Sequence, residues 1–126
     1  LNAGAGTITL GGNVGETSNL AAFKIAAASV ANLLNIETDG AMDIKATNIY
    51  LNGTTYTSDT AGSVQFDGSV GLGDNVSVTT AGTHITDDII FSGTIDSNQT
   101  LTLDAGVASI DLQGGAGVEV AANLPD

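Results

Sequence analysis

The 126-residue sequence predicts an all-β protein, a parallel β-helix (β-solenoid) of about six rungs with roughly 20 residues in each rung. This fold class rests on a recurring strand-and-corner pattern and on a repeated segment. A large apolar residue, any residue and then glycine recur along the chain, and each such apolar residue follows another by two positions. Period-two alternation that ends at a glycine is typical of a short strand that meets a corner.

The start of the chain is repeated near its end. Residues 1–15 align without a gap on residues 103–117, an offset of 102 residues, and Leu, Ala-Gly, Ile-x-Leu and Gly recur at matching positions. Self-similarity at a fixed spacing indicates a repeat architecture. We therefore predict that residues 1–126 form a single β-solenoid segment, which holds one 102-residue tandem-repeat unit and the start of the next.

Strands can be placed in chain order at the glycine corners. The alternating pairs that end at these corners are Ile8/Leu10, Ile49/Leu51, Val64/Phe66, Ile89/Phe91 and Ile110/Leu112. The second members of these pairs are 41, 15, 25 and 21 residues apart, which we interpret as one double rung and three single ones. A continuous apolar column should then be formed by the inward side chains of Ile8, Ile49, Leu51, Val64, Phe66, Val76, Val78, Phe91, Leu101, Leu103 and Ile110.

The stretch from Leu20 to Ile44 fits two interpretations. Its apolar residues up to Leu34 have the spacing of a short amphipathic helix, and the three alanines at 26–28 favour helix. Alternatively, strands lie at residues 23–25, 34–36 and 42–44, each with an alternating apolar pair. We favour strands, because the double rung needs them, and Asp39-Gly40 then forms a turn.

Composition and charge exclude several kinds of function. Aromatic residues make up 4% of the chain, and cysteine and tryptophan are absent, so the core must be built mainly from aliphatic residues, which suits a narrow solenoid. The formal net charge is −12, and Lys24 and Lys45 are the only Lys or Arg residues. Nucleic acid and anionic membrane surfaces are therefore not expected as partners. No apolar stretch is long enough for membrane insertion.

The strand-and-corner pattern resembles the tandem-repeat passengers of bacterial surface adhesins of the filamentous-haemagglutinin-like and autotransporter type. The resemblance rests on residues 1–15, 20–25, 49–53, 66–74 and 90–96, and it covers nearly the whole chain. It implies a right-handed parallel β-helix that is secreted to the cell exterior and works as a stalk, filament or adhesive fibre. Residues 25–49 depart from the shorter spacing of that family.

No catalytic residue, cofactor site or metal site is predicted, and the protein is not expected to be an enzyme. His84 is the only histidine, which rules out a zinc site built from several histidines, and its position at a turn suggests a solvated loop residue. Oxygen ligands of the kind that calcium prefers are carried by Asp87 and Asp88, by Asp96 with Asn98, and by Asp104. The tandem Gly-Gly-x-Gly-x-Asp pattern of calcium-binding solenoids is missing, so we interpret these acids as solvated turn residues.

Thr-x-Thr occurs three times, at residues 7–9, 55–57 and 100–102, and its threonines face outward if the middle residue faces inward. A flat ladder of such pairs would bind ice, and this binding role is the alternative to a structural one. Gln65, Ser77 and Asp111 take the place of threonine on other strands and interrupt the ladder. Outward threonine is also ordinary strand surface.

The expected function is structural. A β-helix exposes N–H and C=O groups at both ends, and neither the first residues nor the segment around Pro125 has the composition of a cap. Copies of the chain are therefore expected to stack head to tail as an extracellular fibre or adhesin stalk, since head-to-tail contacts that do not close generate fibres. Which host surface or glycan such a fibre attaches to stays open.

Overall fold

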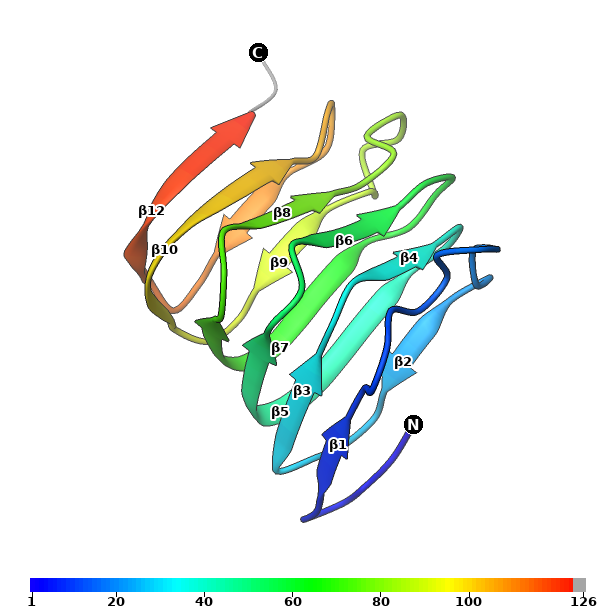
Figure 1. Ribbon diagram of the computed structural model, residues 1–126. Helices are drawn as coiled ribbons and strands as arrows, with labels where there is room; N and C mark the ends of the chain where they lie inside the picture. Colours follow the sequence, from blue (N-terminus) through cyan, green and yellow to red (C-terminus); the bar gives the residue numbers. More distant parts are fainter. Residues whose placement is uncertain (124–126) are drawn as a thin grey trace.

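The computed structural model describes residues 1–123 and shows a right-handed parallel β-helix (Figure 1). The chain makes about 5 turns of about 22 residues each, close to the six rungs expected, and the described part contains no helix. Neighbouring rungs are joined throughout by parallel strand pairs. Pro125, around which no cap is predicted, lies outside the described residues.

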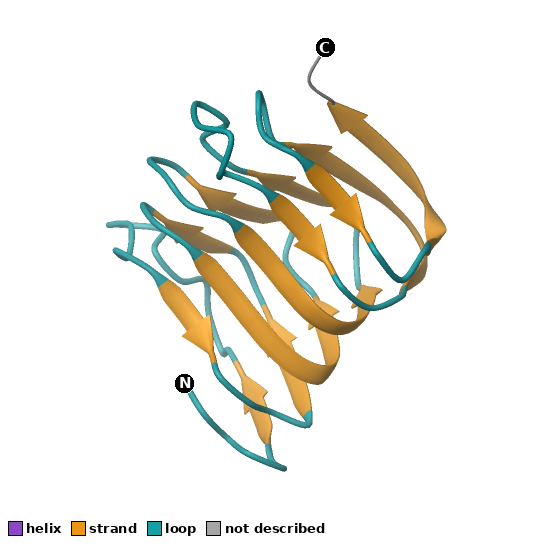
Figure 2. Cartoon of the chain, turned by 180° about the vertical axis from the view of Figure 1, so that it is seen from behind, coloured by secondary structure: helices purple, strands orange, loops and turns teal. Residues whose placement is uncertain are grey.

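Equivalent strands of successive rungs stack to form three faces, A, B and C (Figure 2). Face A consists of β2 (Phe23–Ile25), the first parts of β5 (Met42–Leu51) and β7 (Val64–Leu72), β9 (Ile89–Phe91) and β11 (Ile110–Leu112). Face B consists of β1 (Thr7–Thr9), β3 (Val30–Leu33), the second parts of β5 and β7, and the first parts of β10 (Ile95–Asp104) and β12 (Ala116–Asn123). Face C consists of β4 (Ile36–Thr38), β6 (Thr55–Ser58), β8 (Val76–Thr79) and the last parts of β10 and β12.

The predicted apolar column forms the core. Phe66 and Phe91 are fully buried, which confirms the register, and seven further members of the predicted column are also buried. The two remaining members, Ile8 and Ile110, are half-buried and pack against the core from its two ends. Alternation along each strand therefore predicted inward and outward side chains correctly, because every strand of a β-helix has one face on the core and one on solvent.

The strand register explains why the chain makes five turns rather than six. Ile8 pairs with Ala31, and Ala31 pairs with Ile49, so the 41-residue interval is indeed two rungs. Phe66 pairs with Phe91, which confirms the 25-residue interval as one rung. The 15-residue interval was misinterpreted, since it leads from Leu51 on face B to Phe66 on face A and is less than a full turn.

Residues 20–44 form strands and no helix, as we favoured. The strands predicted at 23–25 and 42–44 are present in β2 and the start of β5, but the strand predicted at 34–36 is wrong. A corner lies there instead, between the buried side chains of Leu33 and Ile36. Asn35 Oδ1 accepts hydrogen bonds at this corner from the N–H groups of Thr54 (2.7 Å) and Thr55 (3.1 Å) on the next rung. The carbonyl oxygen of an asparagine side chain thus bonds the backbone where the strand ladder is interrupted.

The two matching segments at residues 1–15 and 103–117 occupy different faces. Ile8 lies on face B beside Ala31, whereas its sequence counterpart Ile110 lies on face A beside Ile89. Ala116, six residues after Ile110, lies on face B. There it pairs with Ile95 and extends the apolar column. The sequence match therefore reflects shared strand and corner chemistry, displaced by one face around the solenoid.

Candidate functional site

Face C presents an array of hydroxyl groups. In register, Thr55 pairs with Ser77 and Ser77 with Thr102, while Thr57 pairs with Thr79 and Thr79 with Asp104. We call these six residues the face C array. Their spacing is about 4.8 Å between rungs and roughly 6.6 Å along each strand. The array forms because the alternate residues Tyr56, Val78 and Leu103 are all buried on the inner side.

The structure brings one whole Thr-x-Thr pair, Thr55 and Thr57, and Thr102 of a second pair into this array, and it leaves the third pair elsewhere. Thr7 and Thr9 lie on face B, and Asn32 Nδ2 on the neighbouring strand donates a 3.3 Å hydrogen bond to Thr9 Oγ1. Thr100 lies outside the two aligned columns, because Thr102 rather than Thr100 pairs with Ser77. Only the strand register, which the sequence pattern does not fix, decides which threonines share a face.

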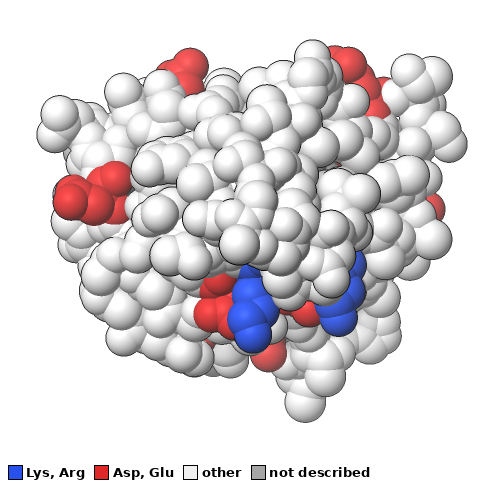
Figure 3. Space-filling model, turned by 90° about the horizontal axis from the view of Figure 1, so that it is seen from below, with Lys and Arg blue, Asp and Glu red and all other residues white. Residues whose placement is uncertain are grey.

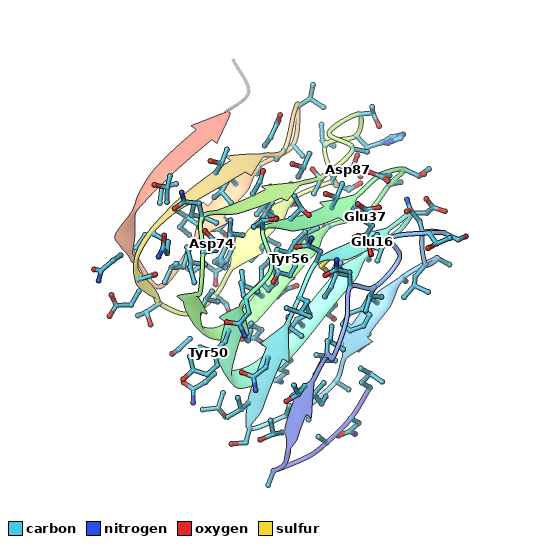
Figure 4. The ribbon with its side chains drawn as sticks, in the orientation of Figure 1. Glu16, Glu37, Tyr50, Tyr56, Asp74 and Asp87 are labelled. Carbon is cyan, nitrogen blue, oxygen red and sulfur yellow. The ribbon has the colours of Figure 1, made fainter. Side chains whose placement is uncertain are left out.

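Asp87 is buried, so the expectation of a solvated turn residue is wrong for this acid. It lies in the loop between β8 and β9 (Figure 4). Its side chain is 1% exposed. Its carboxylate accepts hydrogen bonds from the backbone N–H groups of Gly62 (2.9 Å), His84 (3.1 Å) and Thr83 (3.2 Å). The bond from Gly62, with those from His84 and Thr83, holds the pKa of Asp87 below its usual value, although burial opposes this shift.

The remaining candidate residues are dispersed. His84 is exposed at the tip of the same loop, as predicted. Asp88 Oδ1 accepts from Ser109 N–H at 2.9 Å, and Asp104 Oδ1 accepts from Gly106 N–H at 3.0 Å. Asp96 lies apart from these on face B. Among residues 1–123, no three His, Cys, Asp or Glu side chains come together in a way that could hold a metal ion.

Both lysines line one open hollow of about 350 Å³ on face A (Figure 3). Lys24 Nζ lies 3.8 Å from Asp43 Oδ2, and Asp67, whose Oδ1 accepts a 2.6 Å hydrogen bond from Ser92, lines the same hollow as Lys45. Acidic side chains therefore accompany the two basic ones. Because the ion pair between Lys24 and Asp43 is exposed, it contributes little stability. The sequence did not indicate this gathering, since it depends on β2 and β5 lying side by side.

Both ends of the solenoid present backbone groups that no strand covers. Within the described chain, β1 pairs only with β3 at one end, while β11 pairs only with β9 and β12 only with β10 at the other. The apolar column is open at both ends as well. Its half-buried members are Ile8, Leu10 and Val14 at the first end, and Ile110, Leu112 and Val120 at the other.

No family model, no curated protein and no solved structure matches this chain. Across the described residues there is also no helix with the length and apolar character needed to cross a membrane.

Proposed function

We propose that this chain is a structural module of an extracellular fibre or adhesin stalk, in which each end of the solenoid takes a further rung. That rung belongs either to the same polypeptide or to another copy. The observation that carries the proposal is the pair of open ends, where no strand of residues 1–123 covers the strand ladder or the apolar column. Burying the half-exposed apolar residues and pairing the free backbone groups both favour the addition of a rung.

The first end offers backbone donors in the direction needed. Leu10 N–H donates to Asn32 O at 2.9 Å and so points towards β3. Backbone N–H groups of successive strand residues point to opposite neighbours. Thr9 N–H therefore points away from β3, towards the position of an added rung. A strand placed there would lie about 4.8 Å from β1.

Negative-stain electron microscopy of purified protein tests the proposal. We expect unbranched fibres that high salt does not dissolve, because the contact is made of ladder hydrogen bonds and apolar side chains. Salt also screens the repulsion between copies of net charge −12. Light scattering that shows only monomers at low and high salt would overturn self-assembly.

A matched pair of variants locates the contact. Thr9→Pro removes the outward N–H donor and should shorten or abolish fibres, while the circular dichroism of the strands is retained. Thr9→Ala removes the γ-methyl group and the hydroxyl group, which accepts from Asn32, but keeps the backbone N–H, and it should leave fibres intact. Equal loss of fibres in both variants would show that the ladder edge is not the contact.

A second candidate function, ice binding, is favoured by the face C array. Two aligned columns of hydroxyl-bearing side chains cross three rungs, although Asp104 ends one column. Ser77→Tyr places a bulky ring in the middle of the array, whereas Ser69→Tyr places the same ring on exposed face B. If face C binds ice, Ser77→Tyr alone abolishes inhibition of ice recrystallisation. Wild-type protein without any such inhibition would exclude this role.

A further inference from the structure

Among residues 1–123, Tyr50 is the one Phe or Tyr side chain that the fold leaves on the surface. It is 44% exposed, whereas Tyr56, Phe66 and Phe91 are fully buried and Phe23 is 8% exposed. Tyr50 projects outward from the face B part of β5 (Figure 4). Because this ring does not contribute to the core, it is available for contact with another molecule.

The ring of Tyr50 packs over a neighbouring glycine. Tyr50 pairs in register with Gly71 on the next rung, and a Cβ atom added at Gly71 would lie 3.1 Å from Tyr50 Cδ1 and 3.3 Å from Cε1. Gly71 does not have a positive φ, so the backbone itself does not require glycine here. The missing side chain instead makes room for the ring, one side of which covers Gly71 while the rest stays open to solvent.

Polar side chains surround this ring on the same face. Asn32 pairs with Tyr50 from the preceding rung, Asn48 lies two residues before it on β5, and Asp96 pairs with Gly71 from the following rung. We call Asn32, Asn48, Tyr50, Gly71 and Asp96 the Tyr50 strip. It contains amide donors and acceptors, one carboxylate and no basic residue.

We propose that the Tyr50 strip binds a neutral polysaccharide. The C–H groups of sugar rings carry partial positive charge and are attracted to the negative face of an aromatic ring. Sugar hydroxyl groups donate to Asp96 and exchange hydrogen bonds with the two asparagines. A rigid tyrosine beside Asn and Gly is also a composition that protein binding surfaces favour, since the ring contributes contact area at low entropic cost.

Charge selects a neutral ligand over an acidic one. The strip holds a single charge, that of Asp96, and both lysines lie at the hollow that begins on face A. A chain of net charge −12 repels polyanions, and no cation on the strip offsets that repulsion. Because strip residues follow one another along the solenoid axis about 4.8 Å apart, the geometry suits an extended ligand that crosses several rungs.

This inference names a ligand for the proposed stalk but does not depend on stacking, because the strip lies along the side of the solenoid. Affinity electrophoresis tests it, with native gels that contain hydroxyethylcellulose, laminarin or galactomannan, and polygalacturonate as the acidic comparison. Material that elutes as a monomer is used, so that failure to form fibres leaves this test unaffected. We expect at least one neutral polymer to retard the protein and polygalacturonate not to do so.

Variants assign the retardation to the ring. Tyr50→Ala should weaken it roughly tenfold, because an exposed aromatic anchor carries much of the binding energy of such a surface. Tyr50→Phe should retain most of it, and Gly71→Ala should weaken it by displacing the ring. Thr57→Ala on face C is the matched control and should bind normally. Unchanged retardation of Tyr50→Ala, stronger retardation by polygalacturonate, or no retardation by any neutral polymer would overturn the proposal.

Discussion

Phe66 stacks on Phe91 in the core, with ring centroids 5.0 Å apart and ring planes inclined by 28°. The two residues are register partners on β7 and β9, so the stack runs along the solenoid axis from one rung to the next. Tyr56 meets Phe66 edge-on at 5.9 Å and 87°. These three rings fill the middle rungs, while the described rungs near both ends are filled by aliphatic side chains and by Phe23 on β2. The middle of the solenoid should therefore be its most stable part.

Replacing Phe66 by alanine should test this aromatic centre. The substitution removes a fully buried ring and both of its ring contacts, and we expect a loss of about 3–5 kcal/mol in the free energy of unfolding. Urea denaturation measures the change. Gln65→Ala, at the outward position next to it, should alter stability by less than about 0.5 kcal/mol. Similar losses in the two variants would contradict the inward register of β7.

Much of the fold could be predicted from the sequence, since strand alternation and corner glycines are local signals. Ile49, Leu51 and Phe91 were placed correctly because their outward neighbours are polar or their corners contain glycine. Rung counting was less accurate. The interval from Leu51 to Phe66 has a normal corner pattern at each end, and nothing local shows that the two corners belong to different faces.

Buried polar residues escaped prediction for a related reason. Thr38 and Ser58 are fully buried, and their hydroxyl groups donate to the same carbonyl oxygen, that of Gly40, at 2.7 Å and 2.8 Å. Asp87 bonds backbone groups from two different rungs. Gly40 is 18 residues from Ser58, and Gly62 is 25 residues from Asp87. These partners become neighbours only when rungs stack, so sequence patterns mark such residues as surface.

Substitution at the corner between faces A and B should be costly at Gly93. A Cβ atom added there would collide with the carbonyl oxygen of Gly68 on the preceding rung, and a Cβ atom added at Gly114 on the following rung would collide in the same way with the backbone of Gly93. We expect Gly93→Ala to destabilise the protein by about 1–3 kcal/mol through backbone displacement. Gly11→Ala is the control, since that position is open and its φ is not positive. Thermal denaturation that ranks Gly11→Ala below Gly93→Ala would refute the close stacking of these corners.

The buried phenol of Tyr56 should make stability fall in alkali. Its hydroxyl group donates to Leu33 O and accepts from Gly53 N–H, both at 3.2 Å. Burial raises the pKa of Tyr56 well above its ordinary value of 10.0, and the bond from Gly53 offsets only part of that rise. A raised folded-state pKa contributes stability that is complete below pH 10.0 and is lost as the pH rises above it.

Tyr56→Phe separates the contribution of the phenol's hydrogen bonds from the effect of its ionisation. At neutral pH it leaves Gly53 N–H without its acceptor, while Leu33 O keeps its 2.8 Å hydrogen bond from Asn52 N–H. The loss of the phenol should cost about 1–3 kcal/mol. Above the ordinary pKa of tyrosine, the difference from wild type should shrink, because the variant has no buried phenol to ionise. Urea unfolding across the alkaline range, followed with tyrosinate absorbance, measures both effects. A constant difference at all pH values would mean that the phenol is not buried in solution.

Asp87 should make stability fall in acid. Its carboxylate bonds Gly62 on one rung and His84 and Thr83 on its own loop, and its pKa is lowered from 3.8 chiefly by the bond from Gly62. A lowered folded-state pKa contributes stability that is present above pH 3.8 and is lost as the pH falls through the lower folded value. Asp87→Asn keeps the shape but replaces an acceptor oxygen by an amide donor that faces backbone N–H groups. We therefore expect a loss of about 1–3 kcal/mol at neutral pH.

That loss should be smaller in acid, because protonated Asp87 has itself given up its charge-assisted hydrogen bonds. Urea unfolding of wild type and of Asp87→Asn at about pH 7 and about pH 2 measures the loss with the wild-type Asp87 ionised and with it protonated. Asp111→Asn is the matched control, since Asp111 is exposed and its carboxylate accepts only from the side chain of Gln113 in the described structure. It should leave stability unchanged at neutral pH. A deficit of Asp87→Asn that is as large in acid as at neutral pH would show that the charge of Asp87 does not hold the loop between β8 and β9.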